Sequence, residues 1–511
     1  MQRRQFLKRT LQAGTILPLM SAGLVARPLG ASFFPRAAAA GDRVLVLINL
    51  SGGNDGLNTV VPIDDAAYYT ARQSLAIAKA STLPLQSGLG LHPAMTKVRE
   101  LYDRGECAIV QSVGYPDQDR SHFRSTDIWH SGSDAAEVLY TGWLGRYLEK
   151  IHPEFPDELP SAPFAVQIAS SLSLALQSDQ GNMGIAIDNP DRFYNLANGL
   201  KVPDDPVPST LAGPELTYVR SIVEQSNQFS TGINLAMTNG QTNVSYDGDS
   251  LSTQLKVVAR LINGGLSTGI YVVTLGGFDT HTGQLTRHAQ LLGQLSSAVS
   301  AFLADVAASG NGDRVAVATY SEFGRRVNEN GSAGTDHGAA APQFVFGRKV
   351  LGGTVLGGVP NLTDLDARGD IRFVNDYRQI YSSILEDWLG LDRADVNDAL
   401  GGDFAKLPLF ASSPGSATRE SATYAGLLLE QNAPNPARTE TTIGFSLPRI
   451  GRVSLELRTG DGRLVRHLVD RTLDAGAHRV TLPVGSLASG RYLYTLAFDG
   501  YRISQWMTVV H

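Results

Sequence analysis

The chain has 511 residues, a formal net charge of −6 and one cysteine, Cys107. The single cysteine excludes an intrachain disulfide, and the absence of a basic stripe argues against a nucleic-acid partner. Because the length exceeds that of one typical core, we expect two or more domains. Cys107 begins the apolar run CAIVQSV and is expected to be buried.

Residues 1–40 have the layout of an export signal. Arg3 and Arg4 precede Phe-Leu-Lys and a mildly apolar stretch, and the small residues of RAAAAGD follow. This pattern resembles a twin-arginine signal, which a translocase reads and which is not kept as an anchor. An N-terminal membrane anchor is the alternative, but the apolar stretch is short and broken by Gly and Pro. We predict cleavage near Ala40 and export to the periplasm by the twin-arginine translocase.

Residues 41–411 alternate between strand and helix patterns. We predict strands at 43–50, 107–113, 269–275 and 313–321, and helices at 92–105, 253–264, 284–309 and 376–390. The strands are continuous apolar runs, which is typical of strands covered on both faces. The pattern predicts an α/β unit with a mostly parallel sheet flanked by helices. No apolar run after the signal is long enough to suggest a permanent membrane span.

Carboxylates follow three of these strands where each one ends, and histidines accompany two of the groups. The residues are Asp55, Asp279, His281, Glu322, Asp336 and His337. A single Asp in a glycine-rich loop is usually a turn former, but the repetition at successive strand ends favours a shared site. Carboxylate oxygens and imidazole nitrogens suit a divalent cation, with zinc, magnesium, manganese and calcium all open.

A nucleophile is expected from another loop, DQDRSHFRSTDIWHSG at 117–132. Ser121 lies there between Arg120 and His122. A serine in this electropositive setting can attack a phosphate or sulfate ester while an arginine grips the non-bridging oxygens. The alternative is a loop in which Ser and Asp side chains cap the next helix.

Five motifs in order, LINLSGGNDGLNTVVP, RSHFRSTDIWHSG, GGFDTH, SEFGRRVNENGSAGTDHG and DYRQIYSSILEDWLG, resemble the twin-arginine-exported family numbered 1501 among domains of unknown function. The resemblance covers 41 to about 400. That family is similar to the alkaline phosphatase and sulfatase superfamily, which implies a three-layer α/β sandwich with a two-metal site.

By that resemblance Asp55 is the first ligand and Ser121 the nucleophile. Asp279 and His281 would serve one metal and Asp336 and His337 the other, with Glu322 as a possible additional ligand. The chain departs from the superfamily pattern, because the next histidine after His337 is His467. Three alternatives remain. His122 or His130 takes the place of the missing histidine ligand, or only one metal binds, or the site is no longer catalytic.

A linker at 412–426 is rich in Ser, Ala, Gly and Thr, and short alternating runs with Asp-Gly turns follow it at 427–511. These runs predict a small antiparallel β-sandwich of the immunoglobulin-like type. The stretch LEQNAPNPARTETTIGFSLP and its successors resemble the C-terminal sorting domain of the type IX pathway. The resemblance implies the type IX secretion machinery as a partner and an outer-surface or extracellular location; a generic immunoglobulin-like appendage is the alternative.

Together these features predict an exported metal-dependent hydrolase of phosphate or sulfate esters, with a small-molecule or polymer substrate. The alternative is a non-catalytic cell-surface protein that keeps the fold and at most a structural cation. A third hypothesis is a polysaccharide-binding adhesin. It would need exposed tryptophans, whereas Trp129, Trp143 and Trp388 all lie in core-like patterns.

Replacing Arg3 and Arg4 together by lysine is expected to stop export, because the paired arginines are the part of the signal that the translocase reads. Cell fractionation should then find the unprocessed chain in the cytoplasm. Normal export of this variant would contradict the twin-arginine assignment.

Overall fold

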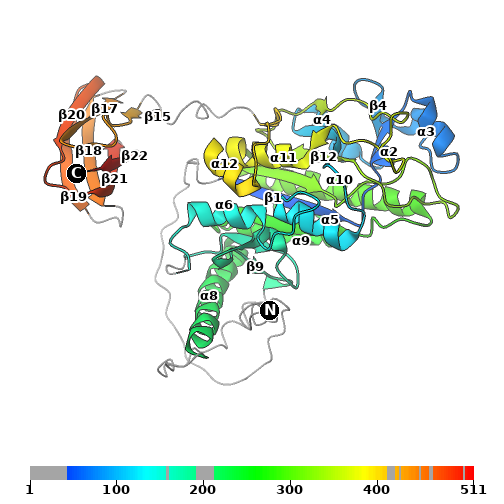
Figure 1. Ribbon diagram of the computed structural model, residues 1–511, viewed down its shortest axis with the longest axis horizontal. Coiled ribbons are helices and arrows are strands. Elements are labelled where there is room, and N and C mark those ends of the chain that lie inside the picture. Colours follow the sequence, from blue (N-terminus) through cyan, green and yellow to red (C-terminus); the bar gives the residue numbers. More distant parts are fainter. Residues whose placement is uncertain are drawn as a thin grey trace. The chain divides into compact units, whose positions relative to one another are not determined.

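The computed structural model divides into two compact units, the first ending at Ala411 and the second beginning at Ser412 (Figure 1). It describes residues 43–156, 160–190, 212–410, 421–424, 427–447, 450–459, 464–498 and 501–510. The predicted signal at 1–40 and most of the predicted linker at 412–426 lie outside these residues. Each unit has its own hydrophobic core.

The first unit is built on a nine-stranded sheet. Its order is β13 (Thr354–Leu356), β5 (Cys107–Gly114), β12 (Ala341–Phe346), β11 (Val315–Tyr320), β1 (Val44–Ser51), β10 (Ile270–Gly276), β6 (Ala165–Gln167) and β9 (Ile185–Ala186), with β14 (Asn375–Asp376) beside β5. All pairs are parallel except those of β12, which is antiparallel to β11 and β5. The mostly parallel sheet predicted from the sequence is therefore confirmed.

Helices cover both faces of this sheet, because successive side chains of a strand point to opposite faces. Val46 and Ile48 of β1 pack with α4 (Thr96–Asp103), α9 (Ser250–Asn263), α10 (Gln284–Ala308) and the C-terminal part of α8 (Ala212–Asn239). Leu45 and Leu47 pack with the other set: α5 (His122–Ser131), α6 (Trp143–Ile151), α11 (Tyr377–Ser383), its π-helical continuation η4 (Ile384–Trp388), and α12 (Arg393–Leu400). Cys107 and the three tryptophans Trp129, Trp143 and Trp388 are buried, as expected.

Short elements complete the first unit: α2 (Gly56–Thr59), β2 (Val60–Pro62), α3 (Ala66–Ala71), η1 (Lys79–Ser81), β3 (Leu83–Pro84), β4 (Leu89–Leu91), η2 (Leu174–Leu176), β7 (Gln177–Ser178), β8 (Gly181–Asn182) and η3 (Gly312–Arg314). The strands β2, β4 and β3 form a small sheet of their own, and β7 pairs with β8. Within the described part of the chain, α10 alone has the length and apolarity of a membrane span. Its apolar residues, among them Leu291, Leu295 and Phe302, are buried against the sheet, as in a core helix.

The second unit is all-β. One sheet has the order β15 (Ser421–Tyr424), β16 (Leu427–Glu430), β17 (Glu440–Leu447) and β20 (Gly476–Pro483). The other has the order β19 (Leu464–Leu473), β18 (Gly451–Thr459), β21 (Gly490–Phe498) and β22 (Tyr501–Val509). Ile443 and Leu482 of the first sheet share a hydrophobic cluster with Leu455 and Tyr494 of the second.

A buried ion pair links the turn after β1 to the chain beyond α3. Arg72 Nη1 lies 2.5 Å from Asp55 Oδ2, and neither side chain is exposed. The same guanidinium donates to Asn58 Oδ1 at 2.9 Å, to the carbonyl of Val327 at 2.9 Å and to that of Arg326 at 2.8 Å. Arg72 thus fixes the residues after β1 against those after β11.

Replacing Arg72 by methionine is expected to destabilise the α/β unit by about 3–5 kcal/mol, because it leaves the Asp55 carboxylate buried without a counter-charge. Urea unfolding measures the loss. Combining Arg72→Met with Asp55→Asn should recover part of it. Arg99→Met, which breaks a solvent-exposed pair with Asp103, should cost less than about 1 kcal/mol. Equal losses for the Arg72 and Arg99 variants would refute this role of the buried pair.

Candidate metal centre

The ends of β1, β10 and β11 meet at one edge of the sheet. β1 lies between β10 and β11 and is parallel to both, so the loops that follow the three strands are neighbours. β5 runs in the same direction, since β12 is antiparallel to both β5 and β11. The segment after β5 leads into α5, whose first residue is His122. Polar side chains from four segments thereby meet where ligands bind in open α/β sheets.

The carboxylate oxygen Asp279 Oδ1 is the hub of this cluster. The Nε2 atoms of His281, His337 and His122 lie 3.1, 3.3 and 3.6 Å from it. His281 Nε2 and His337 Nε2 are 3.0 Å apart, and the ligand atoms of His122, Asp279 and His337 all lie within 4.8 Å of one another. Ligand atoms around a tetrahedral zinc ion are about 3.3 Å apart, because each zinc–nitrogen bond is about 2.0–2.1 Å long. This spacing fits a shared divalent cation.

A hydrogen bond at the other ring nitrogen orients two of these imidazoles. His337 Nδ1 lies 2.8 Å from the carbonyl oxygen of Arg120, and His122 Nδ1 lies 2.8 Å from Glu322 Oε1. Carbonyl and carboxylate oxygens accept hydrogen bonds, so Nδ1 carries the proton in each ring and Nε2 keeps its lone pair. Such partners are the usual means of orienting a histidine toward a metal.

His281 repeats this arrangement with a different carboxylate. Its Nδ1 lies 3.0 Å from Asp336 Oδ1. Asn330 fixes both residues, since its amide nitrogen donates to Asp336 Oδ1 at 3.2 Å and to the carbonyl of His281 at 3.0 Å. The Nε2 lone pair of His281 therefore also faces Asp279, as do those of His337 and His122.

The Nε2 atom of His122 is a buried nitrogen without a hydrogen-bond partner among the described residues. Its distance of 3.6 Å from Asp279 Oδ1 is too long for a hydrogen bond. A buried polar atom left without a partner costs free energy. A cation between the two atoms would satisfy both, so these residues fit a metal ion.

The pKa values of the cluster follow from the same contacts. Burial opposes the ionisation of Asp279, but the hydrogen bond and charge of Arg325 outweigh it and lower the pKa of that carboxyl. Burial lowers the pKa of His337, and the hydrogen bond that His122 donates to Glu322 raises the pKa of His122. An ionised carboxylate and neutral imidazoles are the forms that bind cations, so the lowered pKa values of Asp279 and His337 favour metal binding and the raised pKa of His122 opposes it.

Arg325 joins the loops that carry the cluster. Its side chain is fully buried, and its guanidinium lies 2.7 Å from Asp279 Oδ1. It also donates to backbone carbonyls of all three loops, those of Gly52, Gly53, Phe278 and Thr335. The loop positions therefore depend on one side chain.

Close backbone contacts also require glycine at two positions. Gly52 has a φ of +119°, and a Cβ atom there would lie 2.4 Å from the backbone nitrogen of Asp279. A Cβ atom at Gly334 would lie 2.2 Å from the carbonyl carbon of His281. The loop after β1 and the loop before Asp336 thus pack directly on the backbone of the loop after β10.

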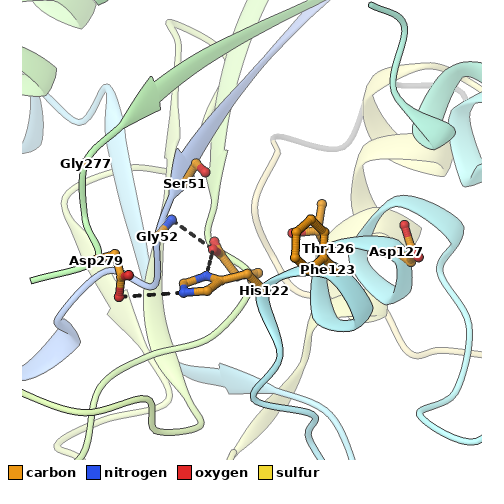
Figure 2. A pocket seen from close by; sticks show the side chains of 9 residues that line it. Ser51, Gly52, His122, Phe123, Thr126, Asp127, Gly277 and Asp279 are labelled. Atoms are coloured by element: carbon orange, nitrogen blue, oxygen red, sulfur yellow. Dashed lines mark hydrogen bonds and ion pairs between the residues drawn. The ribbon is translucent and has the colours of Figure 1, made fainter. Parts of the chain in front are cut away.

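A cavity of about 450 Å³ opens beside the cluster. It is lined by Ser51, Gly52, His122, Phe123, Thr126, Asp127, Gly277, Asp279 and Glu322. Figure 2 shows the His122 ring beside Asp279, with Phe123, Thr126 and Asp127 farther along α5. The other side of the ring contacts Glu322 through Nδ1. The side chain of Asp279 is 48% exposed and that of His281 41%, so the cluster faces solvent on one side.

The remaining predicted site residues occupy other places. Glu322 and Asp336 orient His122 and His281, as described above. Asp55 is held by Arg72, is joined by the side-chain amide of Gln284, and has no partner for its Oδ1 within the described residues.

The loop residues before His122 contact other groups. Arg120 pairs with Asp366 and Asp370, and Ser121 is an exposed residue at the start of α5 that does not line the cavity. Of the two histidines considered for the missing ligand, His122 joins the cluster. His130 is buried, and its Nε2 lies 2.8 Å from the hydroxyl of Tyr320.

Arg325, Asn330 and Arg287 complete the site without being predicted from the sequence. Arg325 follows Glu322 closely in SEFGRR, and this charge in a strand-end loop was an available signal. Arg287 lies on α10, where no pattern distinguishes it from other exposed helix residues. A Cβ atom at Gly277 would lie 2.4 Å from Arg287 Nη2, so this guanidinium packs against Gly277, which lines the cavity, while Arg287 itself is not a lining residue.

Residues 229–407 match the model of a family described as "Protein of unknown function (DUF1501)". This range begins within α8 and contains Asp279, His281, Glu322, Asp336 and His337. The resemblance predicted from the motifs is found over this part of the chain. None of the curated proteins matches the chain.

The chain is similar to solved structures that include a sulfatase, a phosphonate monoester hydrolase and a protein in the alkaline phosphatase superfamily. The PsFucS1 sulfatase from Pseudoalteromonas sp. has 11% sequence identity and a TM-score of 0.32 over 87% of this chain and 84% of its own. The phosphonate monoester hydrolase SpPMH from Silicibacter pomeroyi has 9% identity and a TM-score of 0.31 over 91% and 89%. A protein in the alkaline phosphatase superfamily from Vibrio parahaemolyticus has 11% identity and a TM-score of 0.28 over 79% and 76%. All three TM-scores lie below 0.5, so the chemistry is argued from this chain's own residues.

Replacing Glu322 by glutamine is expected to weaken zinc binding by about tenfold or more, because the carboxylate that orients His122 loses its charge. Competition with a chromophoric chelator measures the affinity. Glu329→Gln is the matched control, since Glu329 accepts from the backbone of Ser74 and Leu75 instead. Wild-type affinity in the Glu322 variant would show that this pair does not support metal binding.

Proposed function

We propose that the protein is a metal-dependent hydrolase whose cation is held by Asp279, His122, His281 and His337. The observation that carries this proposal is the convergence of three Nε2 atoms on Asp279 Oδ1, each ring being oriented through Nδ1. Zinc suits such a nitrogen-rich set best. The exposure of Asp279 and the adjoining cavity favour an open, catalytic site over a closed, structural one.

A phosphate or sulfate ester is the substrate class that we propose. The five-motif resemblance to an alkaline phosphatase and sulfatase-like family supports it. When bound, a divalent cation here would polarise an ester oxygen and lower the pKa of coordinated water. Glu322 keeps His122 in place, and Arg325 keeps Asp279 in place.

Arg287 is the residue that we assign to the anionic group of the ester. Its guanidinium packs against Gly277, a residue of the cavity lining, and its one hydrogen bond within the described residues is to Gln290 at 3.2 Å. Arg120 is bound to Asp366 and Asp370, and Arg124 donates to the carbonyls of Ala135 and Glu137. Arg287 is therefore the better placed arginine to grip non-bridging oxygens.

Ser121 is the nucleophile predicted from the sequence, and water is the alternative. Ser121 is exposed and is absent from the cavity lining, whereas its neighbour His122 lines the cavity. The geometry therefore supports hydrolysis by water more strongly than a serine intermediate.

We also propose that the protein acts outside the cytoplasm. The twin-arginine pattern at the N-terminus supports export to the periplasm. The resemblance of 427–511 to a type IX sorting domain supports passage to the outer surface, with an immunoglobulin-like fold for the two β-sheets. A non-catalytic surface protein with a structural cation is the alternative function.

Protein purified without added metal is expected to contain zinc and to hydrolyse 4-nitrophenyl phosphate or 4-nitrophenyl sulfate. Chelation should abolish hydrolysis and lower the stability of the α/β unit, by about 2.7 kcal/mol where free zinc had been at 100 times Kd. Elemental analysis and thermal unfolding measure both effects. Asp279→Asn combined with His337→Ala should remove the metal and the sensitivity to chelator.

Ser121→Ala separates the two nucleophiles. It should keep both metal and hydrolysis if water attacks, and lose only hydrolysis if Ser121 does. Bound metal without hydrolysis of either ester in the wild type would favour the structural alternative. A wild type without metal, melting alike with and without chelator, would refute the proposal.

A further inference from the structure

An almost fully exposed phenyl ring stands beside the candidate metal centre. Phe123 is 87% exposed, the highest value among the large apolar side chains of the described residues. It follows His122 directly on α5 and lines the same cavity as His122 and Asp279. In Figure 2 Asp279 lies on one side of the His122 ring, and Phe123 on the other.

α5 fixes the backbone position from which this ring projects, relative to the centre. Ser125 and Trp129 of this helix both donate to the backbone carbonyl of Glu322, the latter at 2.8 Å. Glu322 also binds His122. The helix and the loop after β11 are thus tied together at three points, which is the kind of support that keeps a specificity residue in place.

The neighbours of Phe123 on this face are polar. Thr126 and Asp127 lie three and four residues farther along, on the same side of the helix, and both line the cavity. Neither side chain forms a hydrogen bond within the described part of the chain. A phenyl ring offers a flat apolar surface, while a hydroxyl and a carboxylate bind ligand hydroxyl groups.

We propose that Phe123 determines specificity by stacking on a ring in the organic part of the ester. The inference rests on the proposed function, because it takes the anionic group to lie at the metal centre. A sugar and an aromatic group both present the flat apolar face that this stacking needs. Asp127 distinguishes them, because only a sugar offers hydroxyl groups to its carboxylate.

Isothermal titration calorimetry of the zinc-loaded full chain tests this with three probes that the proposed reaction cannot cleave: methylphosphonate, phenylphosphonate and the phosphonate analogue of glucose 6-phosphate, in which a methylene group replaces the ester oxygen. At least one ring-bearing probe should bind about tenfold more tightly than methylphosphonate, the scale of one aromatic contact. Phe123→Ala should bring that ratio close to one, and Phe123→Trp should keep it. Leu351→Ala removes another exposed apolar side chain, near the opposite edge of the sheet, and should leave all three affinities unchanged.

The outcomes separate this inference from the proposed function. Tighter binding of the glucose phosphonate that Asp127→Asn weakens assigns the ring to a sugar. Tighter binding of phenylphosphonate that this variant leaves unchanged assigns it to an aromatic group. Equal affinity of the wild type for all three probes, or a ratio that survives Phe123→Ala, would overturn the role of Phe123 while leaving the metal centre standing. Failure of every probe to bind the zinc-loaded chain would overturn phosphate as the anionic group at the metal centre, and this inference with it.

Discussion

The guanidinium of Arg325 is the contact on which the geometry of the candidate centre depends. It reaches carbonyl oxygens in the loops after β1, β10 and β11, and it holds the carboxylate on which the three imidazoles converge. A fully buried cation is tolerated only when its donors are satisfied. Here the hydrogen-bond acceptors are backbone carbonyls of the loops themselves. The buried guanidinium therefore depends on the loop positions, and the loop positions depend on the guanidinium.

Much of the fold follows from the sequence because buried parallel strands have a simple signature. The runs at 43–50, 107–113, 269–275 and 313–321 became β1, β5, β10 and β11, with ends shifted by one or two residues. The sequence also predicts that the polar residues after β1, β10 and β11 lie at one edge of the sheet. The carboxyl ends of parallel strands all lie at the same edge. The order of the strands across the sheet cannot be predicted in this way, because an apolar run does not indicate which strand lies beside it. That is why the sequence left both His122 and His130 open as ligands, and the structure was needed to place His122 beside Asp279 and His130 beside Tyr320.

The sequence also could not predict which charged side chains pair with one another. Asp55 ends a strand as Asp279 does, yet Arg72, seventeen residues later, neutralises it in the interior. Nothing in the local pattern distinguishes a carboxylate that will meet an arginine from one that will meet imidazoles. The same holds for Arg120 and Arg287. Arg120 is next to Ser121 in the sequence but is paired with two aspartates, whereas Arg287 is distant in the sequence but packs against Gly277 of the cavity lining.

The two sides of the cavity differ in how freely they can change. On the side of Gly52 the backbone packs so closely on Asp279 that no larger residue fits, so mutation there is blocked. On the other side, Phe123 and Asp127 lie on the exposed face of α5, where replacement disturbs no core contact. Substitutions on this face can therefore change which organic group the protein prefers in its substrate, while the metal-binding residues stay the same. The same face offers a place where a library of substitutions would redirect specificity without loss of folding.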